Sequence, residues 1–447
     1  MQISPDEMLF PAPKGKILRA RFDGGEVTSD AGLLFVAQAD RKIGLIQRLA
    51  AQILDPRDQN RVTHSIEDLL RTRIFALSAG YEDTNDLDIL KTDPALLLAC
   101  GKPVGEGETL ASQPTLCRLE NQIDSKDLLC LATELARIVI EQLPNNTKSV
   151  ILDVDATVDP CHGQQEFELF NGYYDTHCYL PLLLHVTAED GRQRLLGALL
   201  RPGTSGASVG LFGLLKRAVK LLRARFPAIE ITLRADGGFG NADVLAFCQE
   251  QRLNYVLGLT SNNRLRALSC GSEAKVVAYA AEIACDAVCY TSLIYQAGTW
   301  ITEQKVACKA ETVAGKLNVR YVVHNRSDEE SAKETYLFYC ERGNQENRIK
   351  DMKLDLFSGR TSCHRFLANQ FRLLLSAAAC VLFSVIQEAL RDTSWASLQI
   401  GTLRLRLIKV GARVVRRCRH IWLHLPTSSP WQRLWHHLHR QLLPPVT

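Results

Sequence analysis

The spacing of apolar residues changes along the chain, and the first change falls near residue 148. Up to that point apolar residues recur every three or four positions, as in "HSIEDLLRTRIFALSAG". In this segment Ser65 and Asp68 have the spacing of a capping box, and Gly80 stands where a helix commonly ends. The pattern predicts a helical N-terminal domain over residues 1–147.

From residue 148 the chain alternates between β-rich runs and helical patterns. The runs "SVILDVDAT", "YLPLLLHVTA" and "RLLGALL" predict three consecutive strands. A strongly amphipathic helix, a strand, a second helix and a further strand follow, up to "NYVLGLT". This order predicts a mixed α/β core, of which residues 148–261 form the first part.

Two more changes of pattern complete the predicted organisation. Residues 262–336 contain short β-like pieces such as "VRYVVHN", which predict a β-rich insertion subdomain. Helical spacing returns over residues 337–395, the predicted second part of the core, and residues 396–447 form a C-terminal region with a strand-like run and a closing helix. The predicted fold class is therefore α/β, a mixed sheet with flanking helices that a β-rich insertion interrupts.

Composition narrows the class of protein. A chain of 447 residues with 46% hydrophobic residues has room for several folded domains. Its longest uncharged apolar stretch, Leu373 to Ile386, is shorter than the roughly 20 residues of a membrane-spanning helix. The start, "MQISPDEMLFPAPKGK", lacks the pattern of a secretion signal, which indicates the cytoplasm. Fourteen cysteines without paired spacing indicate reduced thiols rather than a zinc site.

Charge is unevenly distributed, although the net charge is only +4. Residues 401–447 contain nine Lys or Arg, five His and no Asp or Glu, which suits a polyanionic partner and also an ordinary basic surface. In the N-terminal region "SQPTLCRLENQ" could begin the second helix of a helix-turn-helix-like unit, with Arg118 facing outward, or form a purely structural helix.

Acidic residues stand at the ends of two predicted strands. Asp153 and Asp155 lie two residues apart on the first strand of the core and so share a face. Asp236 falls where a later strand stops and the flexible "GGFG" begins. Acids at two strand ends of one sheet can meet in space, at the edge where α/β proteins bind ligands. Alternatively, these acids simply face solvent.

A third acid lies in the charged helical segment "YCERGNQENRIKDMKLDLF", residues 339–357. At about 100° per residue, four of its polar side chains fall within roughly 60° of one another. These are Tyr339, Arg342, Glu346 and Lys353. An apolar stripe beside them would dock the helix and present Glu346 to its neighbour. A solvated face with pairs such as Glu346 and Lys350 explains the same pattern.

Three carboxylates brought together have a chemical use. They can hold two divalent cations, which activate a nucleophile and stabilise the leaving oxygen of a phosphodiester. Hard oxygen ligands suit Mg²⁺ or Mn²⁺. Neighbouring Arg and Lys side chains would neutralise phosphates.

In its order of strand Asp155, strand-end Asp236 and helical Glu346, the chain resembles the DDE transposases of bacterial insertion sequences. The spacing of Tyr339, Arg342, Glu346 and Lys353 is similar to the Tyr-Arg-Glu-Lys signature of the cut-and-paste branch that includes the Tn-five transposase. Phrases such as "DPRDQNRVTHSIEDLLR", "NGYYDTHCYLPLL" and "TSCHRFLANQFRLLLSAAA" resemble the transposase DDE domain group one family, over about residues 27–425.

The resemblance implies a ribonuclease H-like core and assigns roles to particular residues. Asp155, Asp236 and Glu346 would be the catalytic acids and the ligands of two Mg²⁺ or Mn²⁺ ions, with Asp153 as a rival for the first position. The side chains of Tyr339, Arg342 and Lys353 would contact DNA phosphates.

One aromatic residue of the predicted insertion is a further candidate. Members of this branch that form a DNA hairpin stack a flipped base on an aromatic side chain of the insertion, and Trp300 is the candidate here. A Trp packed within the β-rich subdomain is the ordinary alternative.

The resemblance also implies an activity and partners. The protein would bind the terminal inverted repeats of its element, cleave the element's ends and join the 3′-hydroxyls to target DNA. It would act as a homodimer on double-stranded DNA, without a membrane, in the bacterial cytoplasm near the nucleoid. The N-terminal domain and the basic tail would supply DNA and partner surfaces. Two other functions stay open: a nuclease or resolvase that never joins strands, and a domesticated DNA-binding protein without catalysis.

Overall fold

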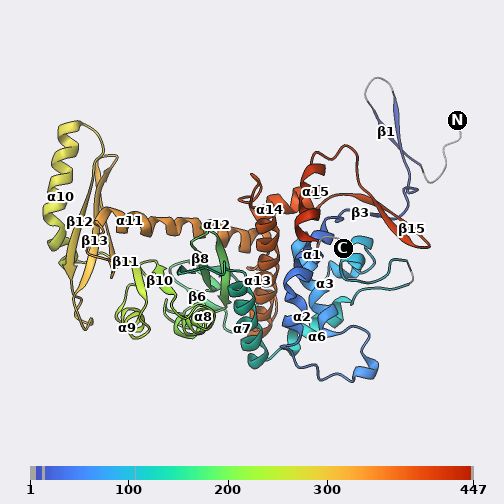
Figure 1. Cartoon of the computed structure of the whole chain (residues 1–447), viewed down its shortest axis with the longest axis horizontal. Coiled ribbons are helices and arrows are strands. Elements are labelled where there is room, and N and C mark those ends of the chain that lie inside the picture. Colours follow the sequence, from blue (N-terminus) through green and yellow to red (C-terminus); the bar gives the residue numbers. More distant parts are fainter. Residues whose placement is uncertain (1–6, 13–15, 106, 444–447) are drawn as a thin grey trace. The chain divides into compact units, whose positions relative to one another are not determined.

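The computed structural model describes residues 7–12, 16–105 and 107–443, without the side chains of residues 344 and 345. The N-terminal stretch 1–16, which lacks the pattern of a secretion signal, lies largely outside these residues. The chain divides into two compact units (Figure 1). The first comprises Met1–Ala50, Asp55–Leu119 and Leu382–Thr447, and the second comprises Ala51–Leu54 and Glu120–Val381.

Short helices make up most of the first unit. They are α1 Leu33–Ile43, α2 Leu45–Ala50, η2 Gln59–Arg61, α3 Ile66–Ala79, α4 Leu87–Leu90, α5 Pro94–Ala99, most of α6 Gln113–Gln122, α14 Ile400–Leu403, η5 Arg404–Ile408 and α15 Gln432–Leu442. One hairpin pairs β1 Met8–Pro11 with β2 Ile17–Ala20. A small sheet contains β3 Val27–Thr28, β15 Ala412–Arg417 and β16 His420–His424, with β15 in the middle.

Helix α3 shows why the local sequence folds as predicted. The Ser65 side chain accepts a hydrogen bond from the Asp68 backbone, and the Asp68 carboxylate accepts one from the Ser65 backbone, at 3.1 and 3.2 Å. Gly80 ends the helix in the left-handed conformation at φ 98°. Ile74 and Phe75 are fully buried. The predicted capping box and glycine stop are both confirmed.

A mixed eight-stranded sheet forms the centre of the second unit. Its strands are β4 Ser149–Ala156, β8 Leu182–Ala188, β9 Gln193–Leu199, β10 Glu230–Ala235, β11 Asn254–Leu259, β12 Val288–Tyr295, β13 Gln304–Val313 and β14 Lys316–His324. Their order is β12-β13-β14-β11-β10-β4-β8-β9. β10 runs parallel to both β4 and β11, while β8 is antiparallel to β4 and to β9. The predicted α/β class is therefore correct.

Helices cover both sides of this sheet in Figure 1. On one side lie α7 Ser125–Glu141, α8 Leu211–Arg225 and α9 Ala242–Glu250, and on the other lie α11 Ala332–Cys340 and α12 Asn344–Lys350. A separate small sheet of β5 Asp159–Pro160, β6 Leu169–Asn171 and β7 Thr176–Tyr179 follows β4 in the chain.

The region expected to be a β-rich insertion begins with a helix that the sequence pattern did not reveal. Helix α10, Asn263–Ile283, buries Leu265, Ser269 and Val276 and leaves most of its surface exposed, so its apolar periodicity is weak. The three strands that follow extend the central sheet through the antiparallel pair of β14 and β11.

Helix α13, Phe366–Ala389, is long and apolar enough to cross a membrane by length and composition. Most of its most apolar window, 89%, is buried within the protein, as in the core helix of a soluble domain. No other helix of the described residues meets the same criteria.

Candidate functional site

The register of the central strands places Asp155 and Asp236 side by side. In the parallel pair of β4 and β10, Asp153 lies opposite Arg234 and Val154 opposite Ala235. The next residues along the two strands are Asp155 and Asp236, at the same end of the sheet. These carboxyl ends are where open α/β sheets bind their ligands.

Asp155 is half-buried, and its pKa is raised above the ordinary value of an aspartate. Its carboxylate accepts hydrogen bonds from the Ala156 backbone at 2.9 Å and from the Arg342 guanidinium at 3.1 Å. Burial raises the pKa of Asp155 to about 6; Arg342 opposes this rise, while the carboxylates of Asp236 and Glu346 add to it. All three predicted acids therefore lie close enough to act on one another electrostatically.

The other two acids have different surroundings. Asp236 is half-buried, and its carboxylate accepts a hydrogen bond from the Gly238 backbone at 2.9 Å, which fixes the turn after β10. Glu346 is exposed in the first turn of α12. Among the described residues, no three His, Cys, Asp or Glu side chains form a preformed metal cluster.

The chemistry of the three acids nevertheless fits a divalent cation. Asp155 resists ionisation because burial and two nearby acids outweigh the single Arg342. A divalent cation would relieve that repulsion, and carboxylate oxygens are its preferred ligands.

The charged segment 339–357 is helical but not one regular helix. Between α11 and α12 lies a 3₁₀ turn, Glu341–Gly343, and after α12 the chain widens into a π-helical turn, η4 Asp351–Asp355. The tighter and the wider turn both change the angle between successive side chains. Consequently, the angle between successive side chains from Tyr339 to Lys353 departs from the ideal 100° per residue.

Tyr339 and Arg342 lie together beside the ends of the strands. The Arg342 guanidinium is 5.8 Å from the centre of the Tyr339 ring, and burial raises the pKa of the Tyr339 hydroxyl. Gly258 on β11 makes this approach possible: a Cβ there would come within 2.7 Å of the Tyr339 hydroxyl oxygen and also of the Gly237 nitrogen. Any larger residue at this position would displace Tyr339 or the turn after Asp236.

Lys353 points to a different acid, one that sequence reasoning missed. Its ammonium donates a hydrogen bond to the Val158 carbonyl and lies 3.8 Å from the Asp159 carboxylate, an ion pair rather than a hydrogen bond. Asp159 is fully buried, and neither of its carboxylate oxygens has a hydrogen-bond partner among the described residues. No sequence pattern marks this acid, because Asp159 stands in an irregular polar stretch.

Replacing Asp159 by Asn is expected to stabilise the protein above neutral pH. Burial raises the pKa of Asp159 from 3.8 to about 7, although Lys353 lowers it. The folded protein therefore holds a proton that the unfolded chain releases, and the stability from this group is lost as the pH rises from 3.8 to about 7. The free energy of unfolding of Asp159→Asn, relative to the parent, should rise by on the order of a few kcal/mol between about pH 4 and about pH 8.

Urea unfolding at several pH values measures this difference. Asp328→Asn is the matched control, because Asp328 is an aspartate with 89% of its side chain exposed. The control should show no such pH dependence. A constant difference between Asp159→Asn and the parent at all pH values would show that Asp159 is already ionised in the folded protein.

Asp153, the rival for the first catalytic position, lies in a buried ion pair below the strand ends. Its carboxylate accepts two hydrogen bonds from Arg234, at 2.6 and 3.0 Å, and one from Gln193 at 3.1 Å. Arg234 is only 3% exposed and also donates to the Phe338 carbonyl of α11 at 2.7 Å. Sequence reasoning missed Arg234, although its position two residues before Asp236 matches that of Asp153 before Asp155.

Trp300 is packed inside the structure. Its side chain is 7% exposed, and its ring meets the ring of Tyr295 edge to face at 5.2 Å between centroids. In this position the ring has no open face for a base.

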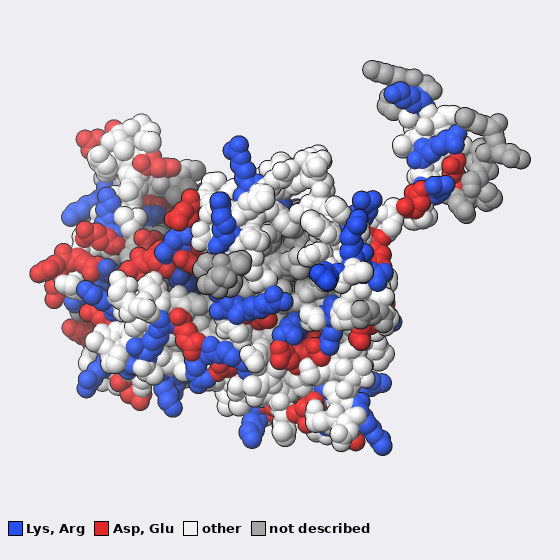
Figure 2. Space-filling model, turned by 45° about the vertical axis from the view of Figure 1, so that its right-hand side comes forward, with Lys and Arg blue, Asp and Glu red and all other residues white. Residues whose placement is uncertain are grey.

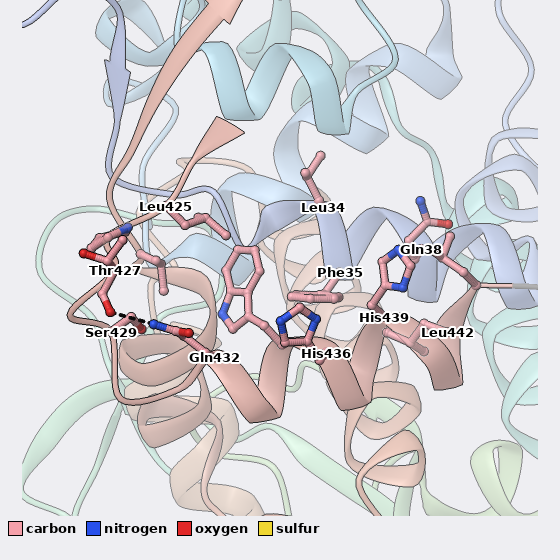
Figure 3. A pocket seen from close by; sticks show the side chains of 14 residues that line it. Leu34, Phe35, Gln38, Leu425, Thr427, Ser429, Gln432, His436, His439 and Leu442 are labelled. Atoms are coloured by element: carbon pink, nitrogen blue, oxygen red, sulfur yellow. Dashed lines mark hydrogen bonds between the residues drawn. The ribbon is translucent and has the colours of Figure 1, made fainter. Parts of the chain in front are cut away.

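A cavity of about 670 Å³ lies in the first unit, between α1 and α15 (Figure 3). Apolar side chains such as Leu34, Phe35 and Leu442 line much of it, together with His436 and His439 of α15. No Asp or Glu is among its lining residues, so it offers no carboxylate ligand for a divalent cation.

Comparison with known proteins identifies a family over nearly the whole chain. The model of the family described as transposase DDE domain group 1 matches residues 10–445. No curated protein matches the chain. Among solved structures, the crystal structure of the NurA nuclease from Sulfolobus solfataricus matches 63% of this chain and 98% of its own, with 11% identity and a TM-score of 0.23. Such a low TM-score carries no argument about fold or function.

Proposed function

Because the chain belongs to the transposase DDE domain group 1 family, we propose that it is the transposase of a bacterial insertion sequence and acts by cut-and-paste. It binds the terminal inverted repeats, cleaves the phosphodiester at each end and joins the 3′-hydroxyls to target DNA. The main support beyond the family is the register that brings Asp155 and Asp236 together at one edge of the sheet.

The proposed core is ribonuclease H-like. The order β9-β8-β4-β10-β11, with only β8 antiparallel to the others, supports this assignment. We also propose that the chain has five regions. They are a DNA-binding region 1–147, two core parts at 148–261 and 337–395, an insertion at 262–336 and a basic region at 396–447.

Asp155, Asp236 and Glu346 are the proposed ligands of two Mg²⁺ or Mn²⁺ ions. When bound, such ions activate the attacking oxygen and stabilise the leaving oxygen of a phosphodiester. Arg342 forms an ion pair with Asp155 at 3.1 Å in the structure. We expect it to exchange this partner for a DNA phosphate when cations occupy the acids.

Tyr339, Arg342 and Lys353 are the proposed phosphate contacts near the cleaved end. For Lys353 this requires a change of partner, because it now contacts Val158 and Asp159. Trp300 stays a candidate for stacking on a flipped base only if its ring leaves Tyr295. Two ends must be held together, so a homodimer on DNA in the bacterial cytoplasm, associated with the nucleoid, is proposed.

The test uses the DNA that flanks the gene. Imperfect inverted repeats bounded by short direct duplications are expected there. Purified protein with Mg²⁺ should excise a plasmid segment bounded by these repeats and insert it elsewhere. Cut ends without joined products would instead indicate a nuclease or resolvase, and binding without cleavage would indicate a domesticated DNA-binding protein.

A further inference from the structure

On the face that Figure 2 shows, basic and acidic side chains are interspersed. A DNA-binding surface therefore has to be sought in local clusters. The hairpin of β15 and β16 is such a cluster, because residues 412–424 contain four Arg and no Asp or Glu. In Figure 1 its strands run outward past α15.

Strand pairing sorts the hairpin side chains onto two faces. Arg413 lies opposite His424, Val415 opposite Trp422 and Arg417 opposite His420. Residues directly opposite each other and residues two apart along a strand share a face. One face therefore has basic or imidazole side chains at both ends and the Val415 and Trp422 pair in the middle.

This face is open to solvent. Trp422 is 54% exposed, and both arginines and both histidines of the face are exposed. The rings of Trp422 and His424 are nearly parallel, at 18° and 6.2 Å between centroids. An exposed Trp between two arginines suits a partner with both charge and apolar surface.

The opposite face attaches the hairpin to its unit. Val414 is 5% exposed, and Arg416 pairs with Glu26 at 3.0 Å and donates to the Val104 carbonyl at 3.2 Å. Strand β15 also pairs with β3. The orientation of the open face is thus fixed within the first unit.

We propose that the open face of the β15–β16 hairpin, formed by Arg413, Arg417, His420, Trp422 and His424, binds the major groove of duplex DNA. Arg413 and Arg417 are four residues apart, about 13 Å along an extended strand. The major groove is about 12 Å wide and admits a two-stranded β-ribbon. The two guanidiniums can therefore reach phosphates on opposite walls while Trp422 faces the bases.

The inference rests on the proposed function for the identity of the polyanion. Beyond that function, it assigns DNA binding to the five residues of the open face and identifies the major groove as their binding site. Nothing in it depends on cleavage, so the hairpin can be tested without divalent cations.

Fluorescence anisotropy with the full chain in EDTA, on a labelled random-sequence duplex and on the matching single strand, tests the proposal. Arg413→Gln combined with Arg417→Gln should weaken duplex binding and lower the slope of log affinity against log salt by about two. Trp422→Ala should weaken duplex binding severalfold and leave the slope unchanged. Arg252→Gln is the matched control, an exposed arginine after α9 in the second unit and outside the basic region 396–447, and should change the affinity little.

Unchanged duplex affinity and slope in the double arginine variant would overturn the proposal. An equal or larger loss on the single strand would also overturn it, since a groove exists only in the duplex. Failure of the proposed function looks different: duplex binding would depend on the hairpin, but the excision assay would give no cleavage.

Discussion

Glu346→Gln and Asp236→Asn are each expected to abolish cleavage that depends on Mg²⁺, while the binding of DNA ends persists. Each change keeps the size of the side chain and removes a proposed cation ligand. Bound cations supply several kcal/mol of transition-state stabilisation, so cleavage should slow by on the order of a thousandfold or more. The rate of end cleavage on a linear fragment and the affinity for the same fragment in EDTA measure the two quantities.

Asp243→Asn is a suitable control, because Asp243 is an exposed acid in the first turn of α9, only a short distance along the chain from Asp236. It should cleave at the parent rate. Retained cleavage in Glu346→Gln or Asp236→Asn would show that the catalytic acids are elsewhere. Loss of end binding together with cleavage would point to a defect in folding or DNA contact instead.

The strand ends that position the two aspartates could be predicted from the sequence. The runs around Asp155 and Asp236 are apolar, β-rich and bounded by polar turns, and the structure has β4 and β10 there in parallel register. Local pattern suffices here because the strands are buried and their ends are marked by charge or glycine.

The features of the site that the hydrophobic pattern does not predict depend on packing between segments that are distant in the sequence. The 3₁₀ and π turns that flank α12 change the 100° spacing of side chains around the helix axis. No local sequence pattern predicts these turns. The pairing of Lys353 with Asp159 and of Arg234 with Asp153 joins residues far apart in the chain. Such pairs follow from register and side-chain direction, which one sequence without the fold does not specify.

Arg234→Met is expected to lower the free energy of unfolding by about 3–5 kcal/mol, because it leaves Asp153 buried without its cation. Asp153 is fully buried, and Arg234 supplies two of the hydrogen bonds to its carboxylate. Asp153→Leu should lower the free energy of unfolding by a similar amount, because it leaves the buried Arg234 without its carboxylate partner. Urea unfolding of the two single variants measures these losses.

The double variant, Asp153→Leu with Arg234→Met, separates stability from positioning. Replacing a buried ion pair by apolar residues of similar size is often neutral for stability, so the double variant should recover most of the loss. The Phe338 carbonyl still lacks the donor that holds the end of α11, next to Tyr339 and Arg342. Misplaced catalytic groups can cost about a hundredfold in rate, so cleavage should stay low despite restored stability. If cleavage also recovered, the ion pair would serve stability alone, and the docking of α11 would have to rest on its packing against the sheet around Tyr336.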